Sequence, residues 1–314
     1  MCRRNKINLA LRLWITRKKY KVQIELIGRI PLAIFGRWIV MGSSIASLFS
    51  RRARANGVIR AEMGREMFQL TPALARRASA ASLLESLIDQ RIYFGRRRRA
   101  NEAWPDLQTV AAALAREIDR VKAKTPGRPV VVSPFHYVSQ YANIYVIDQL
   151  QKLLGVESIA VVSGVPRHIY GNDDAQIPGI KVLYTYGDEN RNGLGVRVAR
   201  ALRRNGIIAM FTDAPPFAMH QYPMQTVDVS MFNRNARIHN GVFRLGASHD
   251  AVLLAFYLRF DQGRFSAKLF EPIALADPDA PQKLAHRIET ALIDNYPNWL
   301  LGGHPSMYAF SPAK

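Results

Sequence analysis

From Val130 onward the chain alternates short apolar runs with amphipathic stretches, and this alternation restricts its fold more than any other feature. The runs at Val130–Ser133, Ser158–Gly164 and Ile207–Asp213 are short and rich in β-branched residues, which is typical of buried strands. Between them lie stretches with helical spacing, such as "GVRVARALRRNG", which closes at Gly206. Strands that alternate with helices pack as layers. We therefore predict an α/β fold with a mixed central sheet flanked by helices.

The rest of the chain extends this pattern in both directions. Residues 61–124 show apolar positions at helical spacing, interrupted by a charged loop at Gly95–Pro105. Further strands are predicted at Lys181–Tyr186, Ala251–Phe260 and Arg264–Ile273, and further helices at Asn143–Gly155, Asn235–Asp250 and Ala280–Leu300. We divide the chain into a basic membrane-associated arm, residues 1–60, and an α/β domain, residues 61–314.

Positive charge is concentrated in the arm. Residues 1–60 contain 14 Lys and Arg against the single acid Glu25, so they carry +13 of the formal net charge of +20. Such a segment is suited to an anionic partner, either phospholipid headgroups, nucleic acid or an acidic protein. The sequence shows neither a helix-turn-helix pattern nor a basic stripe interleaved with aromatic residues, so we do not expect nucleic acid to be the partner.

The apolar run Ile30–Phe49 within the arm has about the length of a membrane span. It also contains Pro31 and Arg37, and its uninterrupted part from Trp38 gives about 18 Å of helix against a hydrocarbon core of about 30 Å. We therefore predict a helix that lies in the membrane interface, with the three arginines of residues 51–54 on lipid phosphates. A tilted span in which Arg37 reaches the interface is the alternative.

Three polar residues fall at the carboxyl ends of predicted strands, where ligands gather in open α/β sheets. His136 follows the first strand, Asp213 ends another, and Arg191 precedes an amphipathic helix. A histidine in this position can act as a general base near neutral pH. A structural histidine, a turn aspartate and a solvated arginine are the alternatives. We expect neither a metal nor a cofactor, because the histidines lack metal-ligand spacing, Cys2 is the single cysteine and no glycine-rich phosphate loop is present.

Five blocks follow one another along most of the chain in an order that resembles a known family. They are "RRARANGVIRAEMG", "VVVSPFHYVSQY", "NRNGLGVRVARALRRNGIIAMFTDAP", "VDVSMFNRNARIHNGVFRLGASHDAVLLAFYLRF" and "IETALIDNYPNWLLGGHP". The chain resembles the bacterial lipid A biosynthesis acyltransferases, the lauroyl/myristoyl transferase group of the lysophospholipid acyltransferase superfamily. The resemblance implies a glycerolipid acyltransferase-like fold at the cytoplasmic face of the bacterial inner membrane, attached peripherally or by a single helix.

The resemblance also implies a reaction. An acyl chain would move from an acyl-carrier protein or coenzyme A thioester to a hydroxyl or amine of a membrane-associated lipid acceptor. In that scheme His136 removes the acceptor's proton, and an acid five residues further on holds the imidazole in the correct tautomer. The implied partners are the acyl donor, an anionic phospholipid membrane and a hydrophobic acceptor.

The sequence departs from this pattern at the orienting acid. The residue five positions after His136 is Tyr141, preceded by Gln140, and neither carries charge at neutral pH. Three interpretations stay open. Tyr141 or Gln140 orients His136 through a neutral hydrogen bond, Asp213 supplies the charge from another strand end, or the protein has lost catalysis and kept lipid or carrier binding.

A second departure concerns substrate binding. Where the family usually has Phe-Phe-Gly, this chain has a methionine followed by Phe232 and Asn233. The candidates for substrate binding are Phe232, Asn233, Arg191 and Gln140. The catalytic candidates are His136, Asp213 and Tyr141.

Overall fold

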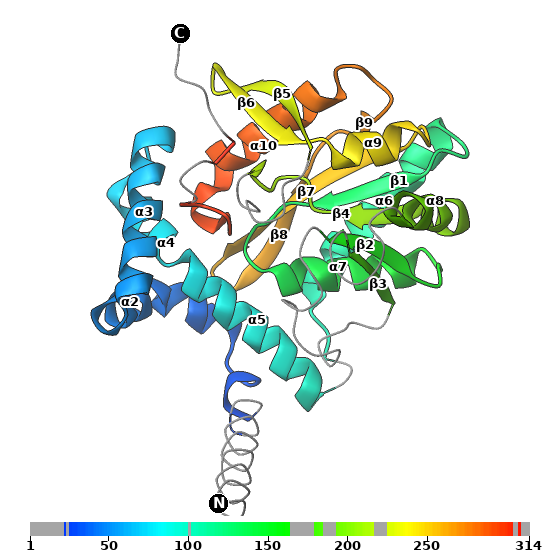
Figure 1. Cartoon of the computed structure of the whole chain (residues 1–314). Coiled ribbons are helices and arrows are strands. Elements are labelled where there is room, and N and C mark those ends of the chain that lie inside the picture. The colour runs from blue at the N-terminus through cyan, green and yellow to red at the C-terminus, as the bar shows by residue number, and fades with distance from the viewer. Residues whose placement is uncertain are drawn as a thin grey trace, which may run out of the picture.

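A seven-stranded mixed sheet forms the centre of the computed structural model, which describes residue 22 and residues 25–99, 102–163, 179–184, 193–216, 225–303 and 307–308 (Figure 1). The strands lie in the order β3-β2-β4-β1-β7-β8, and β9 pairs with β7. Neighbours among β1, β2, β3, β4 and β7 run parallel, whereas β8 and β9 run antiparallel to β7. The predicted α/β fold with a mixed central sheet flanked by helices is confirmed.

The strands form where the sequence is apolar on both faces. Every residue of β1, β2 and β4 is buried, as expected of parallel strands covered by helices on both sides. The bounds are β1 Val130–Pro134, β2 Ile159–Ser163, β3 Ile180–Tyr184, β4 Ile207–Met210, β7 Val252–Asp261, β8 Arg264–Leu269 and β9 Ile273–Ala274. The predicted strand ending at Asp213 thus stops at Met210, and Asp213 lies three residues beyond it.

Two groups of helices pack on this sheet. The first is α6 (Pro105–Lys124) with α7 (Gln140–Leu153), which contact each other, β8 and β2. The second contains α8 (Leu194–Asn205), α9 (Gly241–Ala247) and α10 (Ala280–Asn295). Helix α8 contacts β2, β3, β4 and α9, and helix α10 contacts β5, β7 and β9. A short 3₁₀ turn, η5 at Tyr296–Asn298, follows α10 and leads toward the candidate site.

The prediction of one helix over Asn235–Asp250 is wrong for its first part. Residues Arg234–His239 form strand β6, which pairs antiparallel with β5 (Thr226–Met231) in a separate two-stranded sheet. Ala236 and Ile238 are buried while Asn235 and Arg237 are exposed, which is the period of two that a strand requires. Helix α9 starts only at Gly241.

The charged loop predicted at Gly95–Pro105 is also partly wrong. Helix α5 (Ala81–Arg98) continues through the arginine run, so that Arg96, Arg97 and Arg98 form its last turn. Cations at this position interact favourably with the negative end of the helix dipole. Arg96 and Arg97 also lie over the rings of Tyr145 and Tyr93.

The arm and the domain share a group of N-terminal helices at one side of the sheet (left in Figure 1): α2 (Leu32–Phe49), α3 (Arg51–Phe68), α4 (Pro72–Ser79) and α5. Helix α2 begins after Pro31, runs unbroken through Gly42, and is the one helix in the described residues long and apolar enough to cross a membrane. Its buried side, with Phe35 and Ile39, packs on this group. Arg60, the predicted last residue of the arm, lies inside α3, and its side chain is buried.

The turn between β7 and β8 approaches α2 closely. Gln262 and Gly263 both have positive φ values and form a two-residue hairpin turn. A Cβ atom added at Gly263 would lie 2.4 Å from the Cα of Ala33, which is much shorter than a van der Waals contact between two carbon atoms. The same turn lies 3.4 Å from the position of a Cβ at Gly36. Helix α2 therefore rests directly on the central sheet.

This contact predicts different costs for two otherwise similar substitutions. Gly263 and Gly127 have φ values of 83° and 82°, so alanine at either position costs about 1–2 kcal/mol of backbone strain. Gly127→Ala meets no atom within 4 Å, whereas Gly263→Ala must also displace α2, which adds about 1–3 kcal/mol. Urea unfolding should therefore show a larger loss for Gly263→Ala. Equal losses would mean that α2 does not rest on this turn in solution.

Candidate active site

His136 and Asp213 meet because their strands are neighbours in the sheet. Strands β1 and β4 pair in parallel with Val130 opposite Ile207 and Val132 opposite Ala209. Continued beyond the strand ends, the same register places His136 opposite Asp213. Both residues lie at the carboxyl edge of the parallel sheet, where α/β proteins build their ligand sites.

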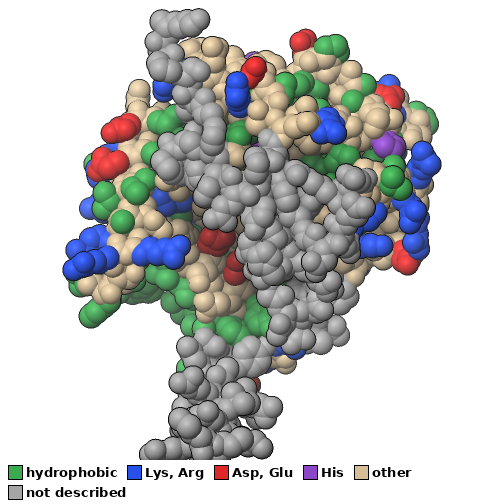
Figure 2. Space-filling view, viewed as in Figure 1, with side chains coloured by type: hydrophobic (Ala, Val, Ile, Leu, Met, Phe, Trp, Pro, Cys, Tyr) green, Lys and Arg blue, Asp and Glu red, His purple; other side chains and the backbone are tan. Residues whose placement is uncertain are grey.

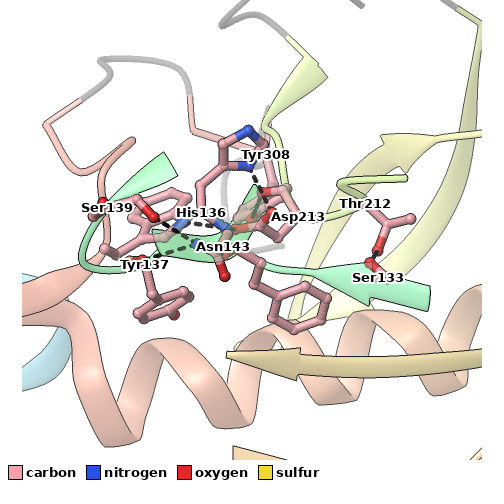
Figure 3. Close-up of polar contacts among 10 residues, drawn as sticks. Ser133, His136, Tyr137, Ser139, Asn143, Thr212, Asp213 and Tyr308 are labelled. Carbon is pink, nitrogen blue, oxygen red and sulfur yellow. Dashed lines mark hydrogen bonds and ion pairs between the residues drawn. The ribbon is translucent and has the colours of Figure 1, made fainter. Parts of the chain in front are cut away.

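The side chains of these two residues form a hydrogen-bonded pair (Figure 3). His136 Nδ1 lies 2.7 Å from Asp213 Oδ1, and the His136 main-chain N–H donates to Asp213 Oδ2 at 2.8 Å. Because a carboxylate can only accept, Nδ1 carries the proton and Nε2 is left free to take one. The Asp213 side chain is 1% exposed and the His136 side chain is 15% exposed, so the histidine is the member of the pair that a substrate can reach.

Asp213 is held by further donors from the C-terminal part of the chain. Trp299 Nε1 donates to Asp213 Oδ2 at 3.0 Å, and Tyr308 OH donates to the Asp213 main-chain oxygen at 2.6 Å. With the two bonds from His136, the buried carboxylate accepts three hydrogen bonds. This number matters because a buried ionised group is costly unless its acceptor sites are filled.

The turn that carries His136 is tightly held. Val138 has a φ of 66°, which is unusual for a β-branched residue, and Ser139 N–H donates to Tyr137 O at 2.8 Å across it. The Asn143 amide, from the first part of α7, donates to the carbonyl oxygens of Tyr137 at 3.1 Å and Ser139 at 2.9 Å. Strained backbone that is fixed by several bonds is common where a side chain must be aimed.

Two more carboxyl groups face this region from one side of α5. Asp89 accepts a hydrogen bond from Ser139 Oγ at 2.5 Å and one from Tyr141 N–H at 3.2 Å. Glu85 lies one helical turn earlier, and burial, reinforced by repulsion from Asp89, raises its pKa to about 7, against the opposing charges of Arg60 and His136. Burial also raises the pKa of Asp89. Neither acid was identified from the sequence.

Tyr141 and Gln140, the two residues predicted to replace the family's acid, lie elsewhere. The Tyr141 ring packs edge-on against Tyr93, with ring centroids 5.9 Å apart, and burial raises its pKa to about 12. Gln140 is exposed at the first position of α7. The group that hydrogen-bonds the His136 ring is Asp213, one of the three alternatives that the sequence left open.

The two remaining substrate-binding candidates that the structure describes lie in the β5–β6 hairpin, and not on the strand ends that carry His136 and Asp213. Phe232 and Asn233, with φ values of 51° and 57°, form the turn between β5 and β6, and the Phe232 ring packs edge-on against Phe68 of α3 at 5.6 Å. Arg191 lies outside the described residues. The sequence did not identify three residues that hold the site together, which are Trp299, Tyr308 and Asn143. Only "NYPNWL", within a block that resembles the family, pointed toward the first of them.

Within the described part of the chain, no group of three or more His, Cys, Asp and Glu side chains is placed to hold a metal ion. No protein-family model matches the chain, and no curated protein matches it. The geometry of the site is that of a general base: a partly exposed histidine whose ring is oriented by a buried carboxylate.

The raised pKa of Glu85 predicts a pH dependence of stability. A buried acid with a folded-state pKa of about 7 binds more protons when folded than when unfolded between pH 4.5 and 7, so the free energy of unfolding falls as pH rises through this range. At about 1.4 kcal/mol per pKa unit, Glu85→Gln should remove about 3 kcal/mol of the difference between pH 5 and pH 8. Urea unfolding at both pH values measures this, with Glu62→Gln on the exposed side of α3 as control. An unchanged pH dependence would show that Glu85 ionises freely.

Proposed function

We propose that the protein is an acyltransferase that moves a fatty acyl chain from a thioester of acyl-carrier protein or coenzyme A to a hydroxyl or amine of a membrane-associated acceptor. The observation that carries this proposal is the hydrogen-bonded pair of His136 and Asp213 at the carboxyl edge of the sheet. The order of the family-like sequence blocks supports the same reaction.

In the proposed mechanism His136 is the general base. Its Nε2 takes the proton from the acceptor as the acceptor's oxygen or nitrogen attacks the thioester carbonyl carbon, forming a tetrahedral oxyanion. The oxyanion then collapses, the C–S bond breaks, and the departing thiolate takes the proton back from His136. Asp213 keeps the other proton on Nδ1 and stabilises the imidazolium in between.

The proposed membrane attachment is supported by the outer side of α2. Ile34, Trp38, Met41, Ile45 and Leu48 recur at spacings of three and four residues, and all five are exposed. Figure 2 shows hydrophobic side chains gathered at the lower left, in the region of α2, with Lys and Arg side chains beside them. This combination suits the headgroup region of an anionic bilayer, at the cytoplasmic face of a bacterial inner membrane in our proposal.

A general base predicts a defined mutational pattern. His136→Ala should abolish thioester consumption with a bacterial lipid extract as acceptor, and Asp213→Asn should lower kcat by about 10³- to 10⁴-fold through the wrong tautomer. Tyr141→Phe, which keeps the ring on Tyr93, should stay close to wild type. Thioester binding without turnover by folded wild-type protein, over several acceptors, would instead favour a catalytically silent binder of lipid or carrier protein.

The exposed side of α2 predicts vesicle binding. Replacing Trp38, Leu48 and Phe49, which are 56%, 70% and 86% exposed, by serine should release the protein from phosphatidylglycerol vesicles in a sedimentation assay. The control replaces Leu153 and Ile293, which are 55% and 62% exposed but lie on α7 and α10.

Wild-type protein should also leave the vesicles at high salt or in alkaline carbonate, because an interfacial helix with basic flanks is held partly by screened charge. Retention through carbonate washing would show that α2 spans the bilayer. Binding that survives the triple replacement would place the membrane contact elsewhere.

A further inference from the structure

Arg60 is an arginine of the basic arm whose side chain points into the protein. It is 2% exposed, in the middle of α3. Its Nε donates to Ala78 O at 2.9 Å, and its Nη1 donates to Gly302 O at 2.9 Å and Leu300 O at 3.2 Å. Its Nη2 donates to Trp299 O. All four acceptors are main-chain carbonyl oxygens, three of them in the segment 299–302.

Burying the Arg60 guanidinium between α3 and the segment 299–302 costs desolvation free energy. Burial lowers the pKa of the Arg60 guanidinium, and the nearby Tyr296 and Glu85 oppose that shift. A buried cation is weak evidence for stability, because apolar residues of similar volume often serve as well or better. The planar guanidinium does what an apolar side chain cannot, since it fixes several carbonyl groups in a defined geometry.

The segment that Arg60 fixes also holds both members of the catalytic pair. The Trp299 carbonyl oxygen accepts a hydrogen bond from Arg60, and the Trp299 indole N–H donates to Asp213 Oδ2 at 3.0 Å. Leu300 accepts from Arg60 through its carbonyl, and its N–H donates to His136 O at 2.8 Å. The segment thus has one set of contacts to α3 and another to the pair.

The fit around the guanidinium is close. A Cβ atom at Gly302 would lie 3.0 Å from Arg60 Cζ, and one at Gly303, where φ is 84°, would lie 2.9 Å from Arg60 Cγ. The segment can therefore pass over the arginine only because both positions are glycine. Displacement of the guanidinium would be transmitted to the main chain on which Trp299 stands.

We propose that Arg60 is a positioning residue, which holds the segment 299–302 so that Trp299 and Leu300 keep Asp213 and His136 in register for proton transfer. The arginine acts through the main chain of this segment and touches no substrate. Helix α3, which follows the membrane-facing helix α2, is thereby joined to the catalytic pair through one side chain. The catalytic part of this inference rests on the proposed acyltransferase function, and its structural part does not.

The test compares Arg60→Met and Arg60→Lys with Arg65→Met. Arg65 lies on the same helix, but its side chain is exposed and forms a surface ion pair with Glu62. The first readout is the proton NMR resonance of His136 Nδ1–H in full-length protein, assigned by its loss in Asp213→Asn. It should broaden or disappear in Arg60→Met, weaken in Arg60→Lys, and persist in Arg65→Met.

The second readout is steady-state kinetics. Arg60→Met should lower kcat by about tenfold to a hundredfold with KM little changed, since small misplacements of catalytic groups have effects of this size. Where Arg60→Met does not fold, Trp299→Phe tests the other end of the same linkage, because it keeps an aromatic side chain and removes the indole N–H that donates to Asp213.

The two readouts separate the inference from the proposed function. A wild-type resonance that is sensitive to Arg60, in a protein that turns over no thioester, would support the linkage and refute the acyltransferase. Folded Arg60→Met and Trp299→Phe proteins that keep the resonance and the wild-type kcat would overturn the positioning role, whatever the enzyme's substrates are.

Discussion

The burial of one carboxylate organises this protein. Asp213 is fully buried and accepts hydrogen bonds from the His136 main chain, the His136 ring and the Trp299 indole. Leaving any of these acceptor sites empty would expose the full desolvation cost of the charge, so three distant parts of the chain must converge on it. The strained turn at Val138, the amide of Asn143 and the segment that follows α10 are the means by which they converge.

Basic and acidic residues occupy different parts of the chain. Residues 1–60 carry +13 of the formal net charge of +20, whereas the carboxyl groups of Asp213, Glu85 and Asp89 lie in the interior around the turn that carries His136. A basic exterior favours approach to an anionic membrane or an acidic carrier protein.

Sequence reasoning predicted the layers of the fold but not the contacts that complete the site. Buried parallel strands are readable from continuous apolar runs, and His136 and Asp213 were recognisable as strand-end residues. Their pairing depends on which strands are neighbours and in what register, and 77 residues of chain separate them. The β5–β6 hairpin was missed because its two-residue turn, Phe232 and Asn233, lacks the glycine that usually marks such turns.

The residues that support the His136–Asp213 pair are harder to predict from the sequence than the pair itself, and Arg60 is an example. In the sequence it looks like the other arginines of the arm, yet its contacts to the segment 299–302 lie about 240 residues away along the chain. A local signal does exist, because Gly57, Ala61 and Gly64 form a small-residue stripe on the same side of α3, and that stripe is the buried one. An arginine on a stripe of small residues is a better candidate for a buried role than one outside it.

The way His136 and Asp213 are paired also limits how relatives of this chain can gain or lose residues. One residue of extended chain advances about 3.3 Å and reverses the direction of the side chain, which is more than the 2.7 Å hydrogen bond can absorb. A single insertion between Met210 and Asp213, or between Pro134 and His136, would therefore separate the pair even if every other residue were kept. The lengths of these two short connections are under tighter constraint than their composition. A homologue is best recognised by the same two spacings, two residues from the end of β1 to the histidine and three from the end of β4 to the aspartate.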